Sequence, residues 1–219
     1  MGLAENLIQV QQRISGACAR VERPPSSVTL LAVSKGMPPD VVNEAARAGL
    51  SLFGENKVQE ARAKIPLCSG KLHWHLIGHL QSNKAKDAVR VFDVIQTVDS
   101  IELAERMSRI AEAEGNRAEV LLQVNVGREE QKSGVDVEDL PGLAKRVAAL
   151  PSLDLTGLMA IPPAGEAEAM RPYFRELKSL RDALGLRDLS MGMTDDFEVA
   201  IEEGATIIRV GRAIFGARG

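Results

Sequence analysis

The stretch "TLLAVSKGMPPD" (residues 29–40) carries the pattern on which the interpretation of the whole chain depends. Its apolar run, residues 30–33, is short, branched and uninterrupted, which is typical of a parallel strand buried on both faces. The glycine and prolines within residues 36–39 end such a strand, so Lys35 lies at its carboxyl end. A lysine there either reaches solvent, as most terminal lysines do, or belongs to a functional site.

The rest of the chain alternates short apolar runs with amphipathic stretches. Strands are predicted at residues 29–34, 52–54, 72–77, 94–98, 120–124, 155–159, 189–191 and 206–210. Helices are predicted at residues 3–21, 40–48, 58–64, 82–89, 101–114, 139–149, 166–184 and 196–202. Alternating strands and helices demand a parallel sheet, and eight repeats in about two hundred residues fit a closed barrel better than an open sheet. We therefore predict an α/β fold, a single-domain (β/α)8 TIM barrel over residues 1–219 with an extra N-terminal helix outside it.

Composition excludes several classes of function. The chain has 219 residues, 45% of them hydrophobic and 26% charged, which is ordinary for a globular protein. A net charge of -3 and only 3% aromatic residues give no footprint for nucleic acid. No signal peptide opens the chain and no long apolar run interrupts it, so we expect a cytoplasmic protein without a membrane partner. Cys18 and Cys68 lack metal-binding spacing and are expected to be free thiols.

The carboxyl ends of the strands carry the active site in barrels of this kind. Residues that follow or end the predicted strands therefore share one rim. They are Lys35, Glu55, Asn56, His79, Asn125, Met159, Ser190, Arg209 and Gly211. This convergence favours a functional role for Lys35.

The three histidines all lie in "LHWHLIGH" (residues 72–79). His73 and His75 share one face of a strand, which suggests a metal site. A barrel metal site needs further ligands on other strands, and no other histidine is present to supply them. We predict no metal, and expect His79, on the rim, to lie near a ligand.

Asn56 opens the segment "NKVQE" (residues 56–60) and has two compatible interpretations. It is placed to cap the following helix, with Gln59 completing a capping box, and it also lies where it can contact a ligand. Ser82 and Asp195 are expected to be plain helix caps.

The loops after the seventh and eighth strands, "LSMGMTDD" (residues 189–196) and "VGRAIFG" (residues 210–216), suit a phosphate. Ser190 offers a hydroxyl, Gly211 permits close backbone approach, and the turn that starts at Arg212 offers N–H groups. In "TIIRVG" (residues 206–211) the alternation turns Arg209 toward the barrel interior. A guanidinium there needs a buried carboxylate or a ligand.

A strand-end lysine, a phosphate rim and an arginine between them suit pyridoxal 5'-phosphate (PLP). The chain resembles the YggS/PROSC family of PLP homeostasis proteins, barrels similar to the N-terminal domain of alanine racemase. The matching motifs are "AVSK", "FGENKVQE", "WHLIGHLQSNK", "VDS", "QVN", "KSG", "GLM", "LSMGMTDDFEVAI" and "IRVGRAIFG".

The resemblance implies a set of roles in cofactor binding. It implies Lys35 as the Schiff-base lysine, Asn56 beside the cofactor and Met159 lining the site. It also implies Ser190 and the Gly211 backbone on the phosphate, with Arg209 near the pyridine nitrogen. The family usually has threonine where this chain has Arg212, which replaces a hydroxyl contact with a charge-assisted one.

The function implied by the resemblance is PLP homeostasis: storage, delivery to PLP-dependent apoenzymes, and amino-acid and keto-acid balance. We expect a monomer. An arginine at the pyridine nitrogen keeps that nitrogen unprotonated, which disfavours carbanion chemistry and turnover.

Two alternatives remain. A racemase-like enzyme needs a second base, in that family a tyrosine from an added β-domain. The chain ends at Gly219 without one, and its one tyrosine, Tyr173, lies in a helical pattern. A Schiff-base aldolase without cofactor would also use a barrel lysine. Lys84 and Lys132 have two interpretations: lysines that bind the cofactor transiently, or solvated loop lysines, and the second is preferred.

Overall fold

Eight parallel strands close into a barrel in the computed structural model, which describes residues 2–129 and 131–216. The strands are β1 (Thr29–Val33), β2 (Leu52–Glu55), β3 (His73–Leu76), β4 (Val94–Val98), β5 (Ala118–Gln123), β6 (Leu153–Met159), β7 (Asp188–Ser190) and β8 (Ile207–Val210). They pair in chain order, and β8 closes the barrel against β1 in the register Leu31 to Arg209. The predicted TIM barrel is confirmed.

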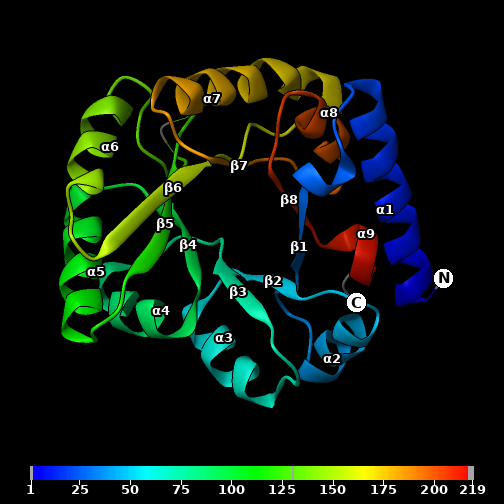
Figure 1. The fold of residues 1–219 in the computed structure, drawn as a ribbon, viewed down its shortest axis with the longest axis horizontal. Helices are drawn as coiled ribbons and strands as arrows, with labels where there is room; N and C mark the ends of the chain where they lie inside the picture. The colour runs from blue at the N-terminus through cyan, green and yellow to red at the C-terminus, as the bar shows by residue number, and fades with distance from the viewer. Residues whose placement is uncertain (1, 130, 217–219) are drawn as a thin grey trace.

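Helices surround the strands on the outside of the barrel (Figure 1). They are α1 (Leu3–Arg20), α2 (Pro39–Arg47), α3 (Val58–Lys64), α4 (Ala85–Val91), α5 (Ile101–Ala113), α6 (Leu140–Ala148), α7 (Arg171–Ala183), α8 (Phe197–Glu202) and α9 (Arg212–Phe215). Short 3-10 turns are η1 (Pro25–Ser27), η2 (Ile65–Leu67), η3 (Ser82–Lys84) and η4 (Ala167–Met170).

Two predicted helices were drawn too long at their starts. The stretch at 166–184 is a 3-10 turn followed by α7, because Pro172 has no N–H and is accepted only in the first turn of a helix. The stretch at 82–89 likewise begins as η3, and α4 then continues to Val91. Strands β5 and β6 each begin two residues earlier than predicted, where Ala118 pairs with Leu153. The polar residues Glu119 and Asp154 interrupt the apolar runs there, so the sequence pattern did not predict the first two residues of each strand.

Strand β1 is covered on both faces, as its sequence predicts. Leu31 and Ala32 are both 0% exposed. Leu31 packs inside the barrel with Ile77 and Ile207, whereas Ala32 joins the main core between strands and helices. The end of this buried strand therefore holds Lys35 at a defined place.

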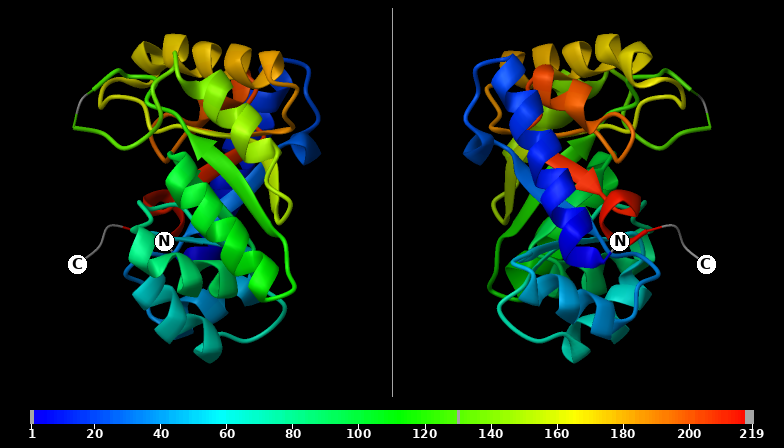
Figure 2. Two further views of the ribbon diagram at one scale, coloured as in Figure 1. Left: turned by 90° about the vertical axis from the view of Figure 1, so that its left-hand side faces the viewer. Right: turned by 90° about the vertical axis from the view of Figure 1, so that its right-hand side faces the viewer.

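The N-terminal helix lies outside the barrel, across α8 and α9 (Figure 2). The Asn6 side chain donates to the Ile214 carbonyl of α9 at 3.0 Å. Arg13 pairs with Glu198 at 3.1 Å and stacks on the Phe197 ring at 4.3 Å. These contacts confirm the extra helix and tie it to α8 and to α9, the helix that follows β8.

Within the described residues, no helix combines the length and the apolar character that a bilayer span requires. The predicted division into one domain, residues 1–219, stays a prediction. Its bounds include Met1, Glu130 and residues 217–219, which lie outside the described residues.

Candidate functional site

A cavity opens at the carboxyl ends of the strands, where the sequence predicts the site. It contains about 850 Å³ of space free of protein atoms, part of it open to solvent. Its lining residues are Val33, Lys35, Met37, Asn56, Ile77, Ile161, Met193, Thr194, Asp195, Arg209, Gly211, Arg212, Phe215 and Gly216. Apolar walls with a few convergent polar groups are typical of sites for small organic ligands.

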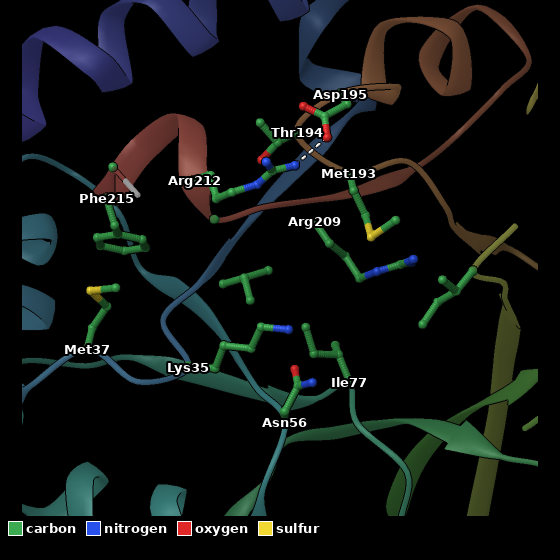
Figure 3. Close-up of a pocket in the computed structure, with 14 residues that line it drawn as sticks. Lys35, Met37, Asn56, Ile77, Met193, Thr194, Asp195, Arg209, Arg212 and Phe215 are labelled. Carbon is green, nitrogen blue, oxygen red and sulfur yellow. Dashed lines mark hydrogen bonds and ion pairs between the residues drawn. The ribbon is translucent and has the colours of Figure 1, made fainter. Parts of the chain in front are cut away.

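Lys35 lies in the turn that follows β1 and directs its amine into the cavity (Figure 3). The Met37 N–H donates to the Ser34 carbonyl at 2.9 Å, which closes a four-residue turn around Lys35. Gly36 has a φ of 76°, the left-handed value that the third position of a type II turn requires. The local sequence Ser-Lys-Gly-Met thus builds the turn that presents the amine.

Asn56 follows β2 and lines the cavity, but it is not a helix cap. The N-cap of α3 is Lys57, and no side chain caps it, so the predicted capping box with Gln59 is wrong. A Cβ on Gly78 would lie 2.2 Å from the Asn56 carbonyl oxygen, so the loops after β2 and β3 approach more closely than any side chain allows. The geometry of this crossing, rather than capping, places Asn56.

The amide oxygen of Asn56 is buried and has no hydrogen-bond partner among the described residues. A buried polar atom without a partner is costly, and most such atoms in folded proteins are satisfied. Because the side chain lies in the cavity, the missing partner is expected to come from a ligand.

Arg209 is 3% exposed and faces the cavity from β8. Its guanidinium donates to the Ser190 hydroxyl and to the Ala160 carbonyl, both at 2.8 Å. Burial lowers the pKa of Arg209 to about 10, which the Asp196 carboxylate partly opposes. Of the two predicted partners, a buried carboxylate or a ligand, no carboxylate accepts a hydrogen bond from Arg209 among the described residues; two neutral oxygens do, and the inward direction is confirmed.

A chain of hydrogen bonds behind Arg209 crosses the barrel interior. The Ser190 hydroxyl donates to the Gln96 amide oxygen at 2.6 Å, and the Gln96 nitrogen lies 2.8 Å from His75 Nδ1. Since an amide nitrogen only donates, His75 accepts at Nδ1 and is neutral. Burial agrees with this, because it lowers the pKa of His75 to about 4.

Three of the eight predicted site residues do not line this cavity. Ser190 is 0% exposed and engaged by Gln96 and Arg209. Met159 is 0% exposed and packs with Val94 and Leu121 inside the barrel. His79 is exposed and lies 3.5 Å from the Ser133 hydroxyl and 4.0 Å from Asp99.

The rim after β7 and β8 contains Gly211 and Arg212. A Cβ on Gly211 would lie 3.2 Å from the Val33 carbonyl oxygen, so glycine lets β8 pass close to β1 at the cavity. Arg212 forms an ion pair with Asp195 across the opening (Figure 3). Asp195 is therefore not the predicted helix cap: α8 begins after Asp196, whose carboxylate accepts from the Met193 N–H at 2.6 Å. Ser82 is not a cap either, because the N-cap of η3 is Gln81.

Sequence reasoning missed the apolar lining and the support behind Arg209. Met37, Ile161 and Met193 carry no chemical signal, although each follows a predicted strand. Gln96 lies within β4 and became recognisable only once its partners were placed. Among the described residues no cluster of three His, Cys, Asp or Glu side chains is arranged to hold a metal ion.

The side chains of the cavity fit PLP. An amine, a guanidinium and the orphaned Asn56 amide converge on one space bordered by the Gly211 backbone and Arg212. An amine reacts with an aldehyde, a guanidinium donates to a ring nitrogen or an anion, and an amide pairs with a ring hydroxyl.

Comparisons with known proteins identify the family of the chain. Residues 6–219 match the family described as "Alanine racemase, N-terminal domain". The pyridoxal phosphate homeostasis protein of Pseudomonas aeruginosa is 48% identical over 220 residues, covering 99% of this chain and 96% of that protein. The structure of PipY of Synechococcus elongatus with PLP bound is 39% identical, with a TM-score of 0.85, covering 98% of this chain and 100% of that one.

A more distant likeness concerns the fold alone. An alanine racemase of Clostridium difficile is 14% identical, with a TM-score of 0.74, and the match covers 99% of this chain and 56% of that one. The two chains share the barrel fold. The chain therefore belongs to the alanine racemase N-terminal domain family and, within it, to the pyridoxal phosphate homeostasis proteins.

Proposed function

We propose that this protein binds PLP reversibly through Lys35 and acts in PLP homeostasis, storing the reactive aldehyde and delivering it. The observation that carries the proposal is the convergence of Lys35, Arg209 and the unpartnered Asn56 amide oxygen in one cavity. The PLP-bound structure of the PipY relative supports the choice of cofactor.

Three residues of the cavity have roles that follow from their chemistry. Bound PLP supplies an aldehyde for covalent attachment and a pyridine ring that draws electrons. Lys35 provides the amine, and the turn around Gly36 holds that amine toward the cavity. Arg209 would donate to the ring nitrogen and, being only a donor, would require that nitrogen to present a lone pair. Asn56 receives the hydrogen-bonding partner that its buried oxygen lacks.

The phosphate belongs at the rim after β8. The Gly211 backbone and the Arg212 side chain both border the cavity there and supply an N–H and a charged donor. Ser190 acts behind Arg209 in this proposal, since its hydroxyl is held by two partners. The predicted contacts of Ser190, Met159 and His79 with the cofactor stay predictions.

Binding is favoured over turnover. Racemisation needs an acid–base group on each face of the ring. Among the residues that line the cavity, the side chains that can carry a proton include Lys35 and Asp195. Asp195 is already paired with Arg212. Tyr173 lies in α7 and packs against the outer core rather than the cavity. The fold shared with an alanine racemase carries no argument for that activity.

The absorption spectrum of the purified protein tests the proposal. Incubation with PLP is expected to give a yellow band that Lys35→Ala lacks, and borohydride reduction is expected to leave a pyridoxyl group on Lys35. Peptide mapping that finds the label mainly on Lys84 or Lys132 would contradict the assignment. A protein that gives no absorption band with PLP, but whose Lys35 still forms a Schiff base with aldehyde substrates, would favour the cofactor-free aldolase.

Activity assays separate carrier from enzyme. We expect L- and D-alanine to interconvert no faster than with free PLP. Saturable racemisation that disappears in Lys35→Ala would favour the racemase alternative.

The setting of this function is also proposed. We expect a cytoplasmic monomer that passes PLP to PLP-dependent apoenzymes. Light scattering of the purified protein tests the monomer. Transfer of the yellow band to an added apoenzyme, faster than from free PLP at equal concentration, tests delivery.

A further inference from the structure

A buried group of charges lies under the turn that carries Lys35. It consists of Lys64, Glu55 and Glu60, and is called here the Lys64 cluster. Lys64 is 6% exposed and Glu55 is 0% exposed, and their charged atoms lie 2.7 Å apart. Glu60, one helical turn before Lys64 on α3, lies 2.9 Å from the same amine.

The Lys64 cluster contacts the backbone on both sides of Lys35. The Lys64 amine donates to the Ser34 carbonyl at 2.9 Å, the same carbonyl that closes the turn with the Met37 N–H. On the other side, the Gly36 N–H donates to Glu60 Oε1 at 2.5 Å. The turn is thus held before and after Lys35 by two side chains of one helix.

Ser34 and Glu55 complete the cluster beneath the turn. The Ser34 hydroxyl donates to Glu55 Oε1 at 2.7 Å, and Ser34 is itself 0% exposed. Burial raises the pKa of Glu55, against the hydrogen bonds from Lys64 and Ser34. Burial also opposes ionisation of Glu60, but its hydrogen bonds to Lys64 and Gly36 prevail and lower its pKa.

Stability alone does not account for this arrangement. Taking charges out of water is costly, and replacing a buried ion pair by apolar residues of similar shape is often neutral or stabilising. Polar residues at these positions therefore need another reason. Their hydrogen bonds end on the two peptide units that flank Lys35.

We propose that Lys64 and Glu60 are positioning residues for Lys35, holding its turn so that the amine faces the cavity. The proposal rests on the proposed function for its link to PLP. Neither residue lines the cavity, so both act through the backbone of residues 34–36.

The test compares two substitutions of Glu60, a partly exposed residue whose replacement the fold is expected to tolerate. Glu60→Gln keeps an oxygen that accepts from the Gly36 N–H, whereas Glu60→Leu removes it. Lys64→Met removes the amine beneath Ser34. Arg171→Met is the matched control, since Arg171 pairs with Glu202 and Glu203 on α8 and its neighbouring turn, in another part of the molecule.

Two measurements are made on each variant. The first is the PLP dissociation constant, from the yellow absorption band. The second needs no PLP: competitive labelling of the cofactor-free protein with acetic anhydride, which reports the reactivity of Lys35 relative to the exposed Lys71. Thermal unfolding shows which variants are folded.

Loss of a hydrogen bond to a charged group corresponds to about tenfold or more, so Glu60→Leu and Lys64→Met are expected to weaken PLP binding by about that factor. The relative labelling of Lys35 is expected to change in both, and Glu60→Gln and Arg171→Met are expected to stay within about threefold of wild type.

The proposal is overturned if folded Glu60→Leu protein labels and binds like wild type, or if Glu60→Gln loses as much as Glu60→Leu. If wild-type protein fails to bind PLP, the proposed function fails, and the labelling of Lys35 still decides the positioning role. If Lys64→Met does not fold, the two Glu60 variants decide it.

Discussion

Arg209 is held in the barrel by oxygens that carry no formal charge. Ser190 and Ala160 accept its hydrogen bonds, and Gln96 and His75 continue the chain behind Ser190. Hydrogen bonds to a charged donor are stronger than neutral ones, which offsets part of the burial cost. These acceptors do not neutralise the positive charge of Arg209. That charge is therefore available to a ligand atom in the cavity that has a lone pair or a negative charge.

Arg212 tests how much of the phosphate site is side chain and how much is backbone. Its ion pair with Asp195 joins two exposed side chains, and such pairs contribute little. Arg212→Thr is expected to weaken PLP affinity by no more than about thirtyfold, because a charge-assisted hydrogen bond of roughly 1.5–3 kcal/mol is exchanged for a neutral one of roughly 1 kcal/mol. Titration by absorbance measures it. A loss of several hundredfold would make Arg212 the main phosphate anchor.

His75 gives the barrel interior a pH dependence. Burial lowers its pKa from 6.5 to about 4, so the unfolded chain binds more protons than the folded one between these values. The contribution of His75 to the free energy of unfolding is present in full above pH 6.5 and is lost as the pH falls to about 4, by roughly 3 kcal/mol.

Urea unfolding at several pH values tests this for His75. His75→Gln keeps an oxygen that accepts from Gln96 and is expected to remove this part of the pH dependence. His73→Gln, at a half-exposed position of the same strand, is the control. An unchanged profile in His75→Gln would show that other groups cause the acid sensitivity.

At the scale of elements, the close crossing of the loops after β2 and β3 determines where Asn56 lies. A side chain at Gly78 would meet the Asn56 backbone at 2.2 Å, and Thr97 of β4 donates to the Gly78 carbonyl at 2.9 Å. Three neighbouring strands therefore fix one wall of the cavity, through one close backbone approach and one hydrogen bond from the Thr97 hydroxyl.

Gly78→Ala tests that wall. The added methyl group has to displace backbone rather than a flexible side chain, so we expect a loss of unfolding free energy of about 2 kcal/mol or more, with weaker PLP binding. Gly142→Ala is the matched control, since a Cβ at Gly142 of α6 meets nothing within 4 Å. Alanine in that helix is expected to stabilise by about 0.5–1 kcal/mol. Equal effects of the two changes in chemical denaturation would contradict this account.

At the scale of the whole molecule, the cavity unites residues from both ends of the chain. Lys35 follows β1, and Arg209 and Gly211 belong to β8 and the turn after it, which pair with β1 as the barrel closes. Helix α1 supports the same region from outside through α8 and α9. Ligand binding is therefore expected to stabilise the barrel at its closure.

A thermal shift measures that coupling. At a PLP concentration of about 100 times the dissociation constant, mass action adds about 2.7 kcal/mol, which corresponds to an increase in Tm of about 5–10 °C for a chain of this size. Lys35→Ala is expected to lose most of the increase. An equal shift with pyridoxine phosphate at the same concentration would show that covalent attachment through Lys35 contributes little, because pyridoxine phosphate lacks the aldehyde.

Much of the fold was predictable because it depends on local patterns. Alternating apolar runs and amphipathic stretches, several of them ended by glycine or proline, predicted eight strand–helix units, and the order of the strands followed. Helix starts were harder to predict, because the choice between a 3-10 turn and an α-helix, as before Pro172, depends on a few backbone hydrogen bonds.

The candidate site was likewise predictable only where it depends on local patterns. The sequence by itself determined that Lys35 ends a buried strand and that Arg209 faces inward, because strand periodicity and the residues of one turn set both. Only the tertiary structure decided that Asn56 crosses Gly78 instead of capping α3, that Ser190 serves Arg209 and Gln96, and that Lys64 lies under the Lys35 turn. These contacts join residues on different elements, and strand register and barrel closure, which no local pattern encodes, bring them together.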